Sequence, residues 1–180
     1  AAHERIRPHI HRTPVFTCNT LNRISAAELY FKCENFQKIG AFKIRGGMNA
    51  SLQLTKEQLE KGVATHSSGN HAQALAFAAK MLGIKAYIVM PESSPQVKVN
   101  AVRGYGAEVI ICASNQAARE STLEAIVERT GATFIHPYDN DEVITGQATC
   151  VKEIIEALPN LDIVVTPVGG GGLLSGTCLG

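Results

Sequence analysis

The sequence predicts an α/β protein with two lobes, in which a mostly parallel sheet is flanked by helices. Apolar runs of strand length alternate with helix-length segments from Val63 onward, and the strand-like runs are apolar at nearly every position. Strands of that kind are typical of a parallel sheet that is buried on both faces. The turn-forming segment 137–141, PYDND, interrupts the pattern, and we expect the chain to cross there from one lobe to the other.

The alternating part of the chain predicts five strands and four helices. The strands are expected at 63–65, 86–90, 108–112, 133–136 and 163–168, and the helices at 70–82, 95–104, 115–129 and 142–157. Upstream, residues 28–34 alternate apolar and polar side chains, which predicts a strand, and a helix is expected at 43–54. The following T-K-E-Q, residues 55–58, has the sequence of a capping box, which indicates another helix start.

Composition restricts the class of protein. Of the 180 residues, 45% are hydrophobic and 18% are charged, which is ordinary for a globular chain with a buried core. The net charge of +1 and the scattered Lys and Arg side chains favour neither a nucleic-acid nor a membrane partner. Five widely spaced cysteines without a C-x-x-C pair indicate reduced thiols and a cytoplasmic protein. The chain stops soon after a helix begins, which predicts that it is part of a longer protein.

The first loop with chemical character is G169-G-G-G-L-L-S-G176, which follows the strand expected at 163–168. Consecutive glycines let the backbone approach a ligand closely, and free N–H groups at a helix start bind anions such as phosphate. The loop lacks the G-x-G-x-x-G spacing of a dinucleotide site and the lysine of a nucleotide P-loop. The pattern therefore predicts a small phosphate ester held by backbone groups, with a flexible linker as the alternative.

The second loop, S67-S-G-N-H71, opens the helix expected at 70–82. One of Ser67, Ser68 and Asn70 could cap that helix, with His71 solvated in its first turn. Four polar side chains around Gly69 exceed what capping requires, however, and hydroxyl, amide and N–H groups together suit a carboxylate ligand. At this point both interpretations stay open.

The third loop carries Lys43, in G40-A-F-K-I-R-G-G47 at the start of the helix expected at 43–54. The positive end of a helix disfavours a cation there, and Phe42 and Ile44 would desolvate it. Both effects lower the pKa of a lysine and favour the neutral, nucleophilic amine. The alternative is a surface lysine on a solvated turn beside Arg45.

Taken together, the three loops indicate one site. They would supply an amine for an aldehyde, a backbone cradle for a phosphate and a polar loop for a carboxylate. Pyridoxal 5'-phosphate with an amino-acid substrate would use all three.

Three motifs in this order, A41-F-K-I-R-G, S67-S-G-N-H-A-Q and G169-G-G-G-L-L-S-G, resemble the fold-type II pyridoxal-phosphate enzymes. The nearest likeness is to the serine racemase and serine/threonine dehydratase branch, and it extends over K32-C-E-N-F-Q-K, Y105-G-A-E and H136-P-Y-D. The resemblance implies a tryptophan-synthase-β-like fold whose two lobes each contain a mostly parallel twisted sheet. It places 1–54 and 140–180 in a large cofactor-binding domain, which is incomplete here, and 55–139 in a small inserted domain.

The resemblance also implies roles for particular residues. Lys43 would carry the cofactor, Phe42 would line its ring and Asn70 would bond the ring hydroxyl oxygen. The phosphate would be held by Gly169, Gly170, Gly171, Gly172 and Leu173. The substrate carboxylate would be surrounded by Ser67, Ser68, Gly69, Asn70 and His71. Tyr138 would face the substrate, although animal serine racemases look to have asparagine there.

For activity, the resemblance implies racemisation of a small hydroxy amino acid, its dehydration to a keto acid and ammonia, or both, with serine as the first candidate. Racemisation needs a proton donor or acceptor on each face of the Cα, so Lys43 and Ser68 are the expected catalytic pair. The alternatives are a threonine or threo-3-hydroxyaspartate ammonia-lyase, a sulfhydrylase or synthase of the same fold, and a non-catalytic phosphate-metabolite-binding regulatory protein.

Further ligands and partners follow only from the resemblance. The family pattern implies a homodimer and a Mg²⁺ site beyond residue 180. ATP is a further candidate ligand, because Gln73, Tyr105 and Lys38 stand at places comparable to a family nucleotide site. The histidines have no carboxylate or cysteine partners at ligand spacing, so no metal site is expected within these residues.

Overall fold

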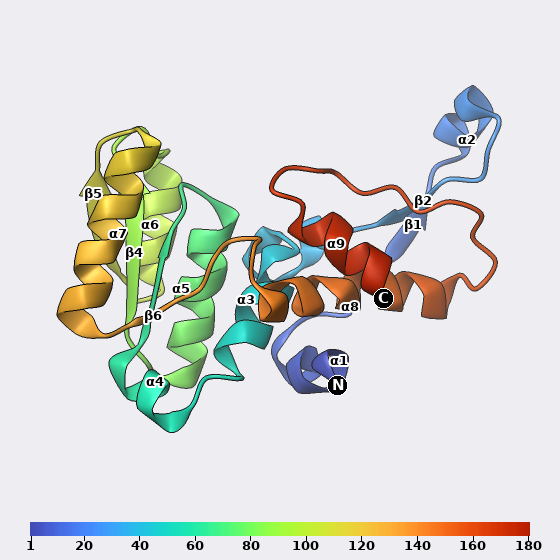
Figure 1. Cartoon of the computed structure of the whole chain (residues 1–180). Helices are drawn as coiled ribbons and strands as arrows, with labels where there is room; N and C mark the ends of the chain where they lie inside the picture. The colour runs from blue at the N-terminus through green and yellow to red at the C-terminus, as the bar shows by residue number, and fades with distance from the viewer.

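The computed structural model describes all residues from 1 to 180, and the chain folds into two lobes joined side by side (Figure 1). The helices are α1 Ala2–Ile6, α2 Asn19–Ser25, α3 Lys43–Ser51, α4 Lys56–Lys61, α5 Asn70–Leu82, α6 Gln96–Gly104, α7 Gln116–Thr130, α8 Asp141–Ala157 and α9 Gly172–Leu179. The 3₁₀ turns are η1 Arg7–His9, η2 Glu34–Phe36 and η3 Lys38–Gly40. The strands are β1 Val15–Thr17, β2 Tyr30–Lys32, β3 Val63–His66, β4 Ala86–Pro91, β5 Glu108–Cys112 and β6 Thr133–Phe134.

One lobe contains the predicted parallel sheet, with strand order β5-β4-β3-β6. Alternate side chains of β3 and β4 enter two separate apolar clusters. Val63 and Ile88 pack with α5 and α6, whereas Ala64 and Val89 pack with Leu123 and other residues of α7. The sheet is therefore buried on both faces, which is why its strands are apolar at nearly every position. The prediction of an α/β fold with a helix-flanked parallel sheet is confirmed.

Local sequence signals account for the helix ends in this lobe. Thr55 and Gln58 form the predicted capping box of α4. Helix α5 spans the predicted 70–82 and stops at Gly83, which adopts the left-handed conformation that glycine tolerates best. Helices α7 and α8 begin one residue away from their predicted starts, after side-chain caps from Asn115 and Asn140.

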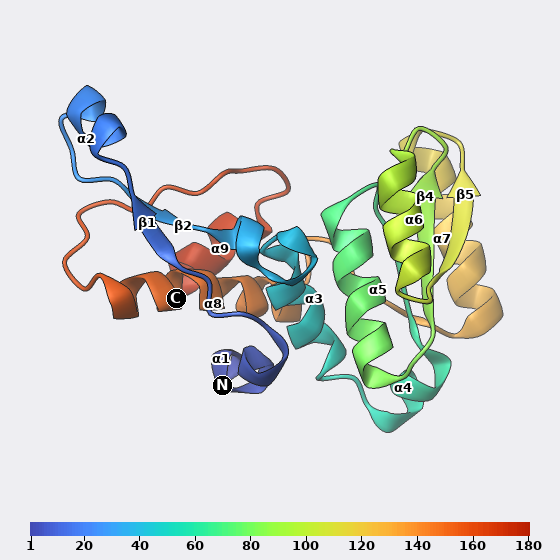
Figure 2. The ribbon, with the colours of Figure 1, turned by 180° about the vertical axis from the view of Figure 1, so that it is seen from behind.

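The other lobe consists of α1, α8 and α9 with a two-stranded antiparallel ribbon, β1–β2, that carries α2 at its outer end (Figure 1). Helix α3 lies between α5 and α8, and Figure 2 shows it between the two lobes. It contacts α8 very closely, because a Cβ atom on Gly146 would lie 2.6 Å from Gly46 Cα. Only residues without a side chain permit this approach.

Several predictions for this lobe are wrong. Residues 163–168 form no strand, since no neighbouring strand pairs with their backbone; Val165 is 87% exposed. The strand expected at 28–34 is limited to Tyr30–Lys32 and pairs antiparallel with β1, so this lobe contains no parallel sheet. The helix expected at 43–54 ends at Ser51, and β6 ends at Phe134 instead of continuing to 136.

All five cysteines are free thiols. None of the helices combines the length and the apolar character that crossing a membrane requires.

Candidate active site

Lys43 is the first residue of α3 and is half-buried. Its Nζ donates a 2.6 Å hydrogen bond to the carbonyl of Pro137 and lies 5.4 Å from the centroid of the Phe42 ring. Desolvation by burial lowers the pKa of Lys43, and no carboxylate pairs with the amine to oppose this. The lowered pKa confirms the direction predicted from the sequence. The alternative, a surface lysine on a solvated turn beside Arg45, is wrong, because Lys43 is half-buried and Arg45 is buried.

The backbone that leads to Lys43 is strained. Ile39 has φ +63°, which is unusual for a β-branched residue, and Gly40 follows at φ +69°. The buried amide of Gln37 holds this turn, because its Oε1 accepts from the N–H groups of His11 and Lys38 and its Nε2 donates to the His11 carbonyl. Strain of this kind persists only where surrounding contacts hold it, and it concentrates at functional sites.

The glycine loop leads into α9 through Gly171, which has φ +88°. No side chain caps this helix, and its first backbone bond runs from Ser175 N–H to the Gly171 carbonyl. A Cβ atom on Gly170 would lie 2.2 Å from the Tyr138 ring, whereas one on Gly169 would meet nothing within 4 Å. Tyr138 therefore packs on one side of the loop, and the uncapped helix start stays available for an anion.

The S-S-G-N-H loop does not cap its helix with a side chain. The N-cap residue of α5 is Gly69, whose N–H donates to Ser67 Oγ at 3.2 Å. Ser67 N–H is bound to the Val89 carbonyl, which ties the loop to β4. Ser68 and Asn70 are exposed. The capping interpretation is therefore wrong, and the Ser68 hydroxyl and the Asn70 amide are free to meet a ligand.

His71 is buried, which contradicts the solvated position that the capping interpretation assigned to it. Its Nε2 lies 3.1 Å from the Ile135 carbonyl, and because a carbonyl only accepts, Nε2 carries the proton. Burial lowers the pKa of His71 to about 3, so the ring is neutral near pH 7. Its Nδ1 is buried without a hydrogen-bond partner.

One short segment, residues 135–138, contacts all three predicted loops. The Ile135 carbonyl meets His71, the Pro137 carbonyl accepts from Lys43, and Tyr138 lies on the glycine loop. Thr65 Oγ1 also donates to the Ile135 carbonyl at 2.8 Å, which fixes the segment against β3. From the sequence, 137–141 is expected as a crossing between lobes, and the resemblance places only Tyr138 of this segment at the substrate. The contacts of its backbone carbonyls with His71 and Lys43 could not be predicted, because every residue type has a backbone carbonyl.

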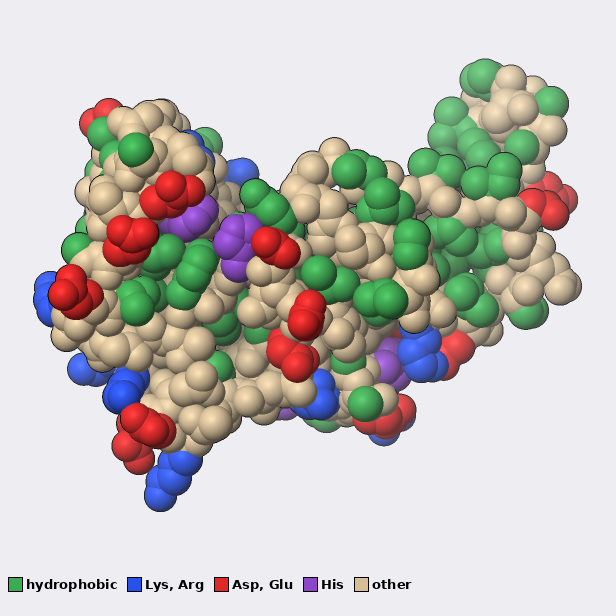
Figure 3. Space-filling view, in the orientation of Figure 1, with side chains coloured by type: hydrophobic (Ala, Val, Ile, Leu, Met, Phe, Trp, Pro, Cys, Tyr) green, Lys and Arg blue, Asp and Glu red, His purple; other side chains and the backbone are tan.

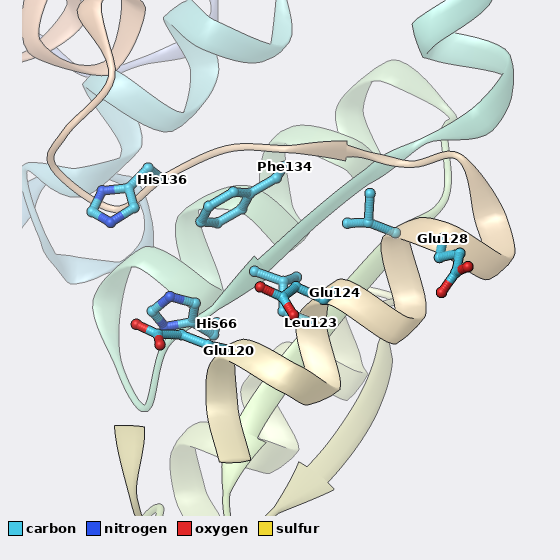
Figure 4. A pocket seen from close by; sticks show the side chains of 8 residues that line it. His66, Glu120, Leu123, Glu124, Glu128, Phe134 and His136 are labelled. Carbon is cyan, nitrogen blue, oxygen red and sulfur yellow. The ribbon is translucent and has the colours of Figure 1, made fainter. Parts of the chain in front are cut away.

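A groove of about 490 Å³ lies beside this segment, between α7 and the ends of β3 and β6 (Figure 4). It is lined by His66, Glu120, Leu123, Glu124, Val127, Glu128, Phe134 and His136. His136 lines the groove, and the centroids of the His136 and Tyr138 rings are 4.6 Å apart. Burial lowers the pKa of both His66 and His136. Figure 3 shows histidine side chains at the surface near the hollow between the lobes.

Comparison with known proteins agrees with the resemblance. The chain is 54% identical over 178 residues to a serine racemase of Dictyostelium discoideum and 52% identical over 179 residues to a beta-hydroxyaspartate dehydratase of Paracoccus denitrificans. Each alignment covers 99% of this chain but only 55% and 57% of the relative, so the chain spans about half the length of the curated relatives that it matches.

The fold is similar to that of the crystal structure of the serine racemase from Dictyostelium discoideum. The TM-score is 0.95, with coverage of 99% of this chain and 58% of that chain. Residues 6–180 match the model of a family described as pyridoxal-phosphate dependent enzymes. With both sequence and fold in agreement, the chain belongs to the pyridoxal-phosphate dependent enzyme family.

Proposed function

We propose that the full-length protein racemises or dehydrates a small hydroxy amino acid, with serine as its first substrate. The observation that carries this proposal is the contact of one segment, 135–138, with Lys43, His71 and the glycine loop. This shared contact supports the assignment of the Lys43 amine, the S-S-G-N-H loop and the glycine loop to a single site. The similarity to a serine racemase at 54% identity supports the substrate class.

The residues present fit pyridoxal 5'-phosphate. Lys43 offers a partly desolvated amine to its aldehyde, and Phe42 lies beside that amine. Gly170 and Gly172 pack so closely on Tyr138 that a Cβ atom on either would press against it, and the uncapped start of α9 offers N–H groups to the phosphate. The phosphate would be held there by Gly169, Gly170, Gly171, Gly172 and Leu173, with Asn70 bonded to the ring hydroxyl.

When bound at Lys43, pyridoxal 5'-phosphate would supply an electron sink for the negative charge that develops at the substrate Cα. Lys43 Nζ would remove the Cα proton, and its lowered pKa favours the neutral amine that this step requires. The exposed Ser68 hydroxyl donates a proton to the opposite face and so inverts the centre. If the β-hydroxyl leaves instead, hydrolysis yields the keto acid and ammonia.

The loop from Ser67 to His71 would bind the substrate carboxylate. Ser68 and Asn70 are exposed and uncommitted, and the N–H groups at the start of α5 have no side-chain cap. Neutral His71 adds no counter-charge, so binding would rely on hydrogen bonds and the helix dipole. Tyr138, which packs on the glycine loop, would stand between the substrate and the phosphate.

A second candidate substrate is threo-3-hydroxyaspartate, because the chain is 52% identical to a beta-hydroxyaspartate dehydratase. A threonine ammonia-lyase stays an alternative. A non-catalytic binder of phosphate metabolites fits less well, since a phosphate site alone has no use for a desolvated, unpaired amine at Lys43.

The test is Lys43→Ala in the full-length protein, with Lys56→Ala as the matched control. Lys56 is also the first residue of a helix, but it is exposed and is not among the predicted site residues. We expect Lys43→Ala to lose the visible cofactor absorption band and turnover of L-serine, D-serine, L-threonine and threo-3-hydroxyaspartate. Persisting turnover with an unchanged band would contradict the proposal.

Ser68→Ala tests the racemase part separately. We expect it to abolish D-serine formation from L-serine and elimination from D-serine, while elimination from L-serine persists. If both D-serine reactions survive, Ser68 is not the second acid/base group.

We also propose a cytoplasmic homodimer with the domain division 1–54 and 140–180 versus 55–139. The free cysteines support a reducing compartment.

Exposed apolar side chains support the homodimer. Ile24 of α2 is 77% exposed and Phe16 of β1 is 53% exposed, on the part of the chain that projects from the molecule (Figure 1). Light scattering of the full-length protein decides the subunit number. Mg²⁺ and ATP binding stay predictions.

A further inference from the structure

Arg45, two residues after Lys43, lies at the centre of a network of buried charged side chains. Arg45 has no exposed side-chain surface, yet all five of its N–H donors are used. Its Nε and Nη2 donate to the two oxygens of Glu34, both at 2.8 Å. Its Nη1 and Nη2 also donate to the two oxygens of Glu153, both at 2.9 Å, and Nη1 reaches Thr149 Oγ1 at 3.2 Å. Because every N–H group of the guanidinium has a hydrogen-bond partner, the Arg45 side chain is held in one orientation.

The network is balanced in charge. Lys32 Nζ donates to Glu153 at 2.6 Å and to the Thr13 carbonyl at 2.8 Å, so two cations face two carboxylates. Burial alone would raise the pKa of Glu153, but the bonds from Arg45 and Lys32 outweigh burial and hold that pKa below its ordinary value. Glu153 is therefore ionised in the folded protein at neutral pH.

The contacts of Arg45 connect α3 to two other parts of the chain. Glu34 belongs to η2, just before the strained turn at Ile39, and Glu153 belongs to α8. Lys43 and Arg45 share the first turn of α3. The bonds of Arg45 to Glu34 on one side and to Glu153 on the other therefore hold the backbone that carries the amine. The Lys43 side chain itself has one hydrogen bond, to the Pro137 carbonyl.

The carboxylates of the network are paired within the network itself. Both buried carboxylates near the start of α3 are bound by Arg45, and Glu153 is bound by Lys32 as well. A carboxylate free to approach Lys43 would raise the pKa of the amine and favour its unreactive, protonated form.

We propose that Arg45 is a positioning residue for Lys43: its buried, fully bonded guanidinium holds the first turn of α3, which carries the amine. This inference rests on the proposed function of Lys43 as the cofactor-bearing and proton-transferring group. It assigns Arg45 no contact with cofactor or substrate.

The experiment uses the full-length protein loaded with pyridoxal 5'-phosphate and the variants Arg45→Lys and Glu34→Gln. Lysine keeps the charge but cannot bond two carboxylates in bidentate fashion. We expect Arg45→Lys to lower kcat by about 10- to 100-fold, as a small misplacement of a catalytic group does, with KM changed less than about threefold. The circular dichroism of the cofactor band should fall, and backbone hydrogen exchange at the start of α3 should accelerate in the cofactor-free protein.

Asn49→Ala is the matched control. Asn49 is a buried residue of the same helix; it accepts from Arg5 Nη1 and donates to the Glu142 carbonyl, so its loss also weakens packing of α3. It lies at the other end of α3 from Lys43. We expect Asn49→Ala to lower the unfolding midpoint while kcat and the dichroism of the cofactor band stay within about twofold of wild type.

These measurements separate a positioning role of Arg45 from a purely structural one. If Arg45→Lys keeps the wild-type kcat and cofactor dichroism, or if Asn49→Ala lowers both as much as Arg45→Lys does, the inference is overturned and Arg45 only stabilises the fold. If Arg45→Lys does not fold, Glu34→Gln decides by the same readouts, because it preserves shape and removes one charge. A wild-type protein without any cofactor band would instead refute the proposed function, and the inference with it.

Discussion

Replacing Gly146 by alanine tests the contact between α3 and α8 that places the first turn of α3. A Cβ on Gly146 would lie 2.5 Å from the Arg45 carbonyl oxygen, 2.6 Å from Gly46 Cα and 2.8 Å from Asn49 Cβ. Ordinary contacts begin near 3.4 Å, so the shortest of these is too close by about 0.9 Å (3.4 Å less 2.5 Å). Two of the three atoms are backbone, so the helices must separate.

The expected cost follows from two opposing terms. Overpacking of a well-packed interface costs about 1–3 kcal/mol. Alanine in a helix interior recovers up to about 1 kcal/mol relative to glycine. The free energy of unfolding should therefore fall by about 0–3 kcal/mol in Gly146→Ala. The wider spacing should also weaken the bonds of Arg45 to Thr149 and Glu153 across the same interface.

Gly104→Ala is the control, because Gly104 is also helical and a Cβ there meets nothing within 4 Å. Urea unfolding of the full-length protein should separate the two variants by about 1–3 kcal/mol, which is about 0.5–1.5 M in midpoint at a slope of about 2 kcal/mol/M. If Gly146→Ala is as stable as Gly104→Ala and retains wild-type kcat, the close contact between α3 and α8 does not exist as described.

Two further predictions concern the site. Gly170→Ala should weaken cofactor binding at least about tenfold in a cofactor titration, because its Cβ would lie 2.2 Å from the Tyr138 ring. Adding Tyr138→Ala should restore part of the affinity. If Gly170→Ala binds the cofactor as tightly as wild type, the glycine loop does not hold the phosphate. Burial lowers the pKa of His71 from its ordinary value of about 6.5 to about 3. Between these two pH values the unfolded chain binds a proton at His71 and the folded chain does not, so the free energy of unfolding should fall as the pH falls. His71→Gln should reduce the slope of unfolding free energy against pH there by up to about 1.4 kcal/mol per unit, and an unchanged slope would show that His71 is not buried as a neutral ring.

Secondary structure in the parallel-sheet lobe could be predicted closely because its signals are local. Helix α5 and strand β5 have the predicted limits, and the Thr55 capping box lies where its sequence indicates. Helix propensity, caps and the apolar pattern of buried strands act over a few residues, so they can be seen without the fold.

Pairing between strands is not local, and there the prediction was wrong. Residues 163–168 are as apolar as β4, yet they form no strand, because a strand is stable only where a neighbour satisfies its backbone groups. The ribbon β1–β2 was half missed for the same reason, since its partner strand, Val15–Thr17, is only three residues long.

By itself the sequence determined which loops carry chemistry: the lysine among apolar neighbours, the four polar side chains around Gly69 and the four consecutive glycines. Only the tertiary structure decided how those groups behave. Lys43 is desolvated because the fold buries it, and its amine meets the carbonyl of residue 137, ninety-four positions away. Burial and charge pairing depend on everything that surrounds a group in space, so they first exist once the chain has folded.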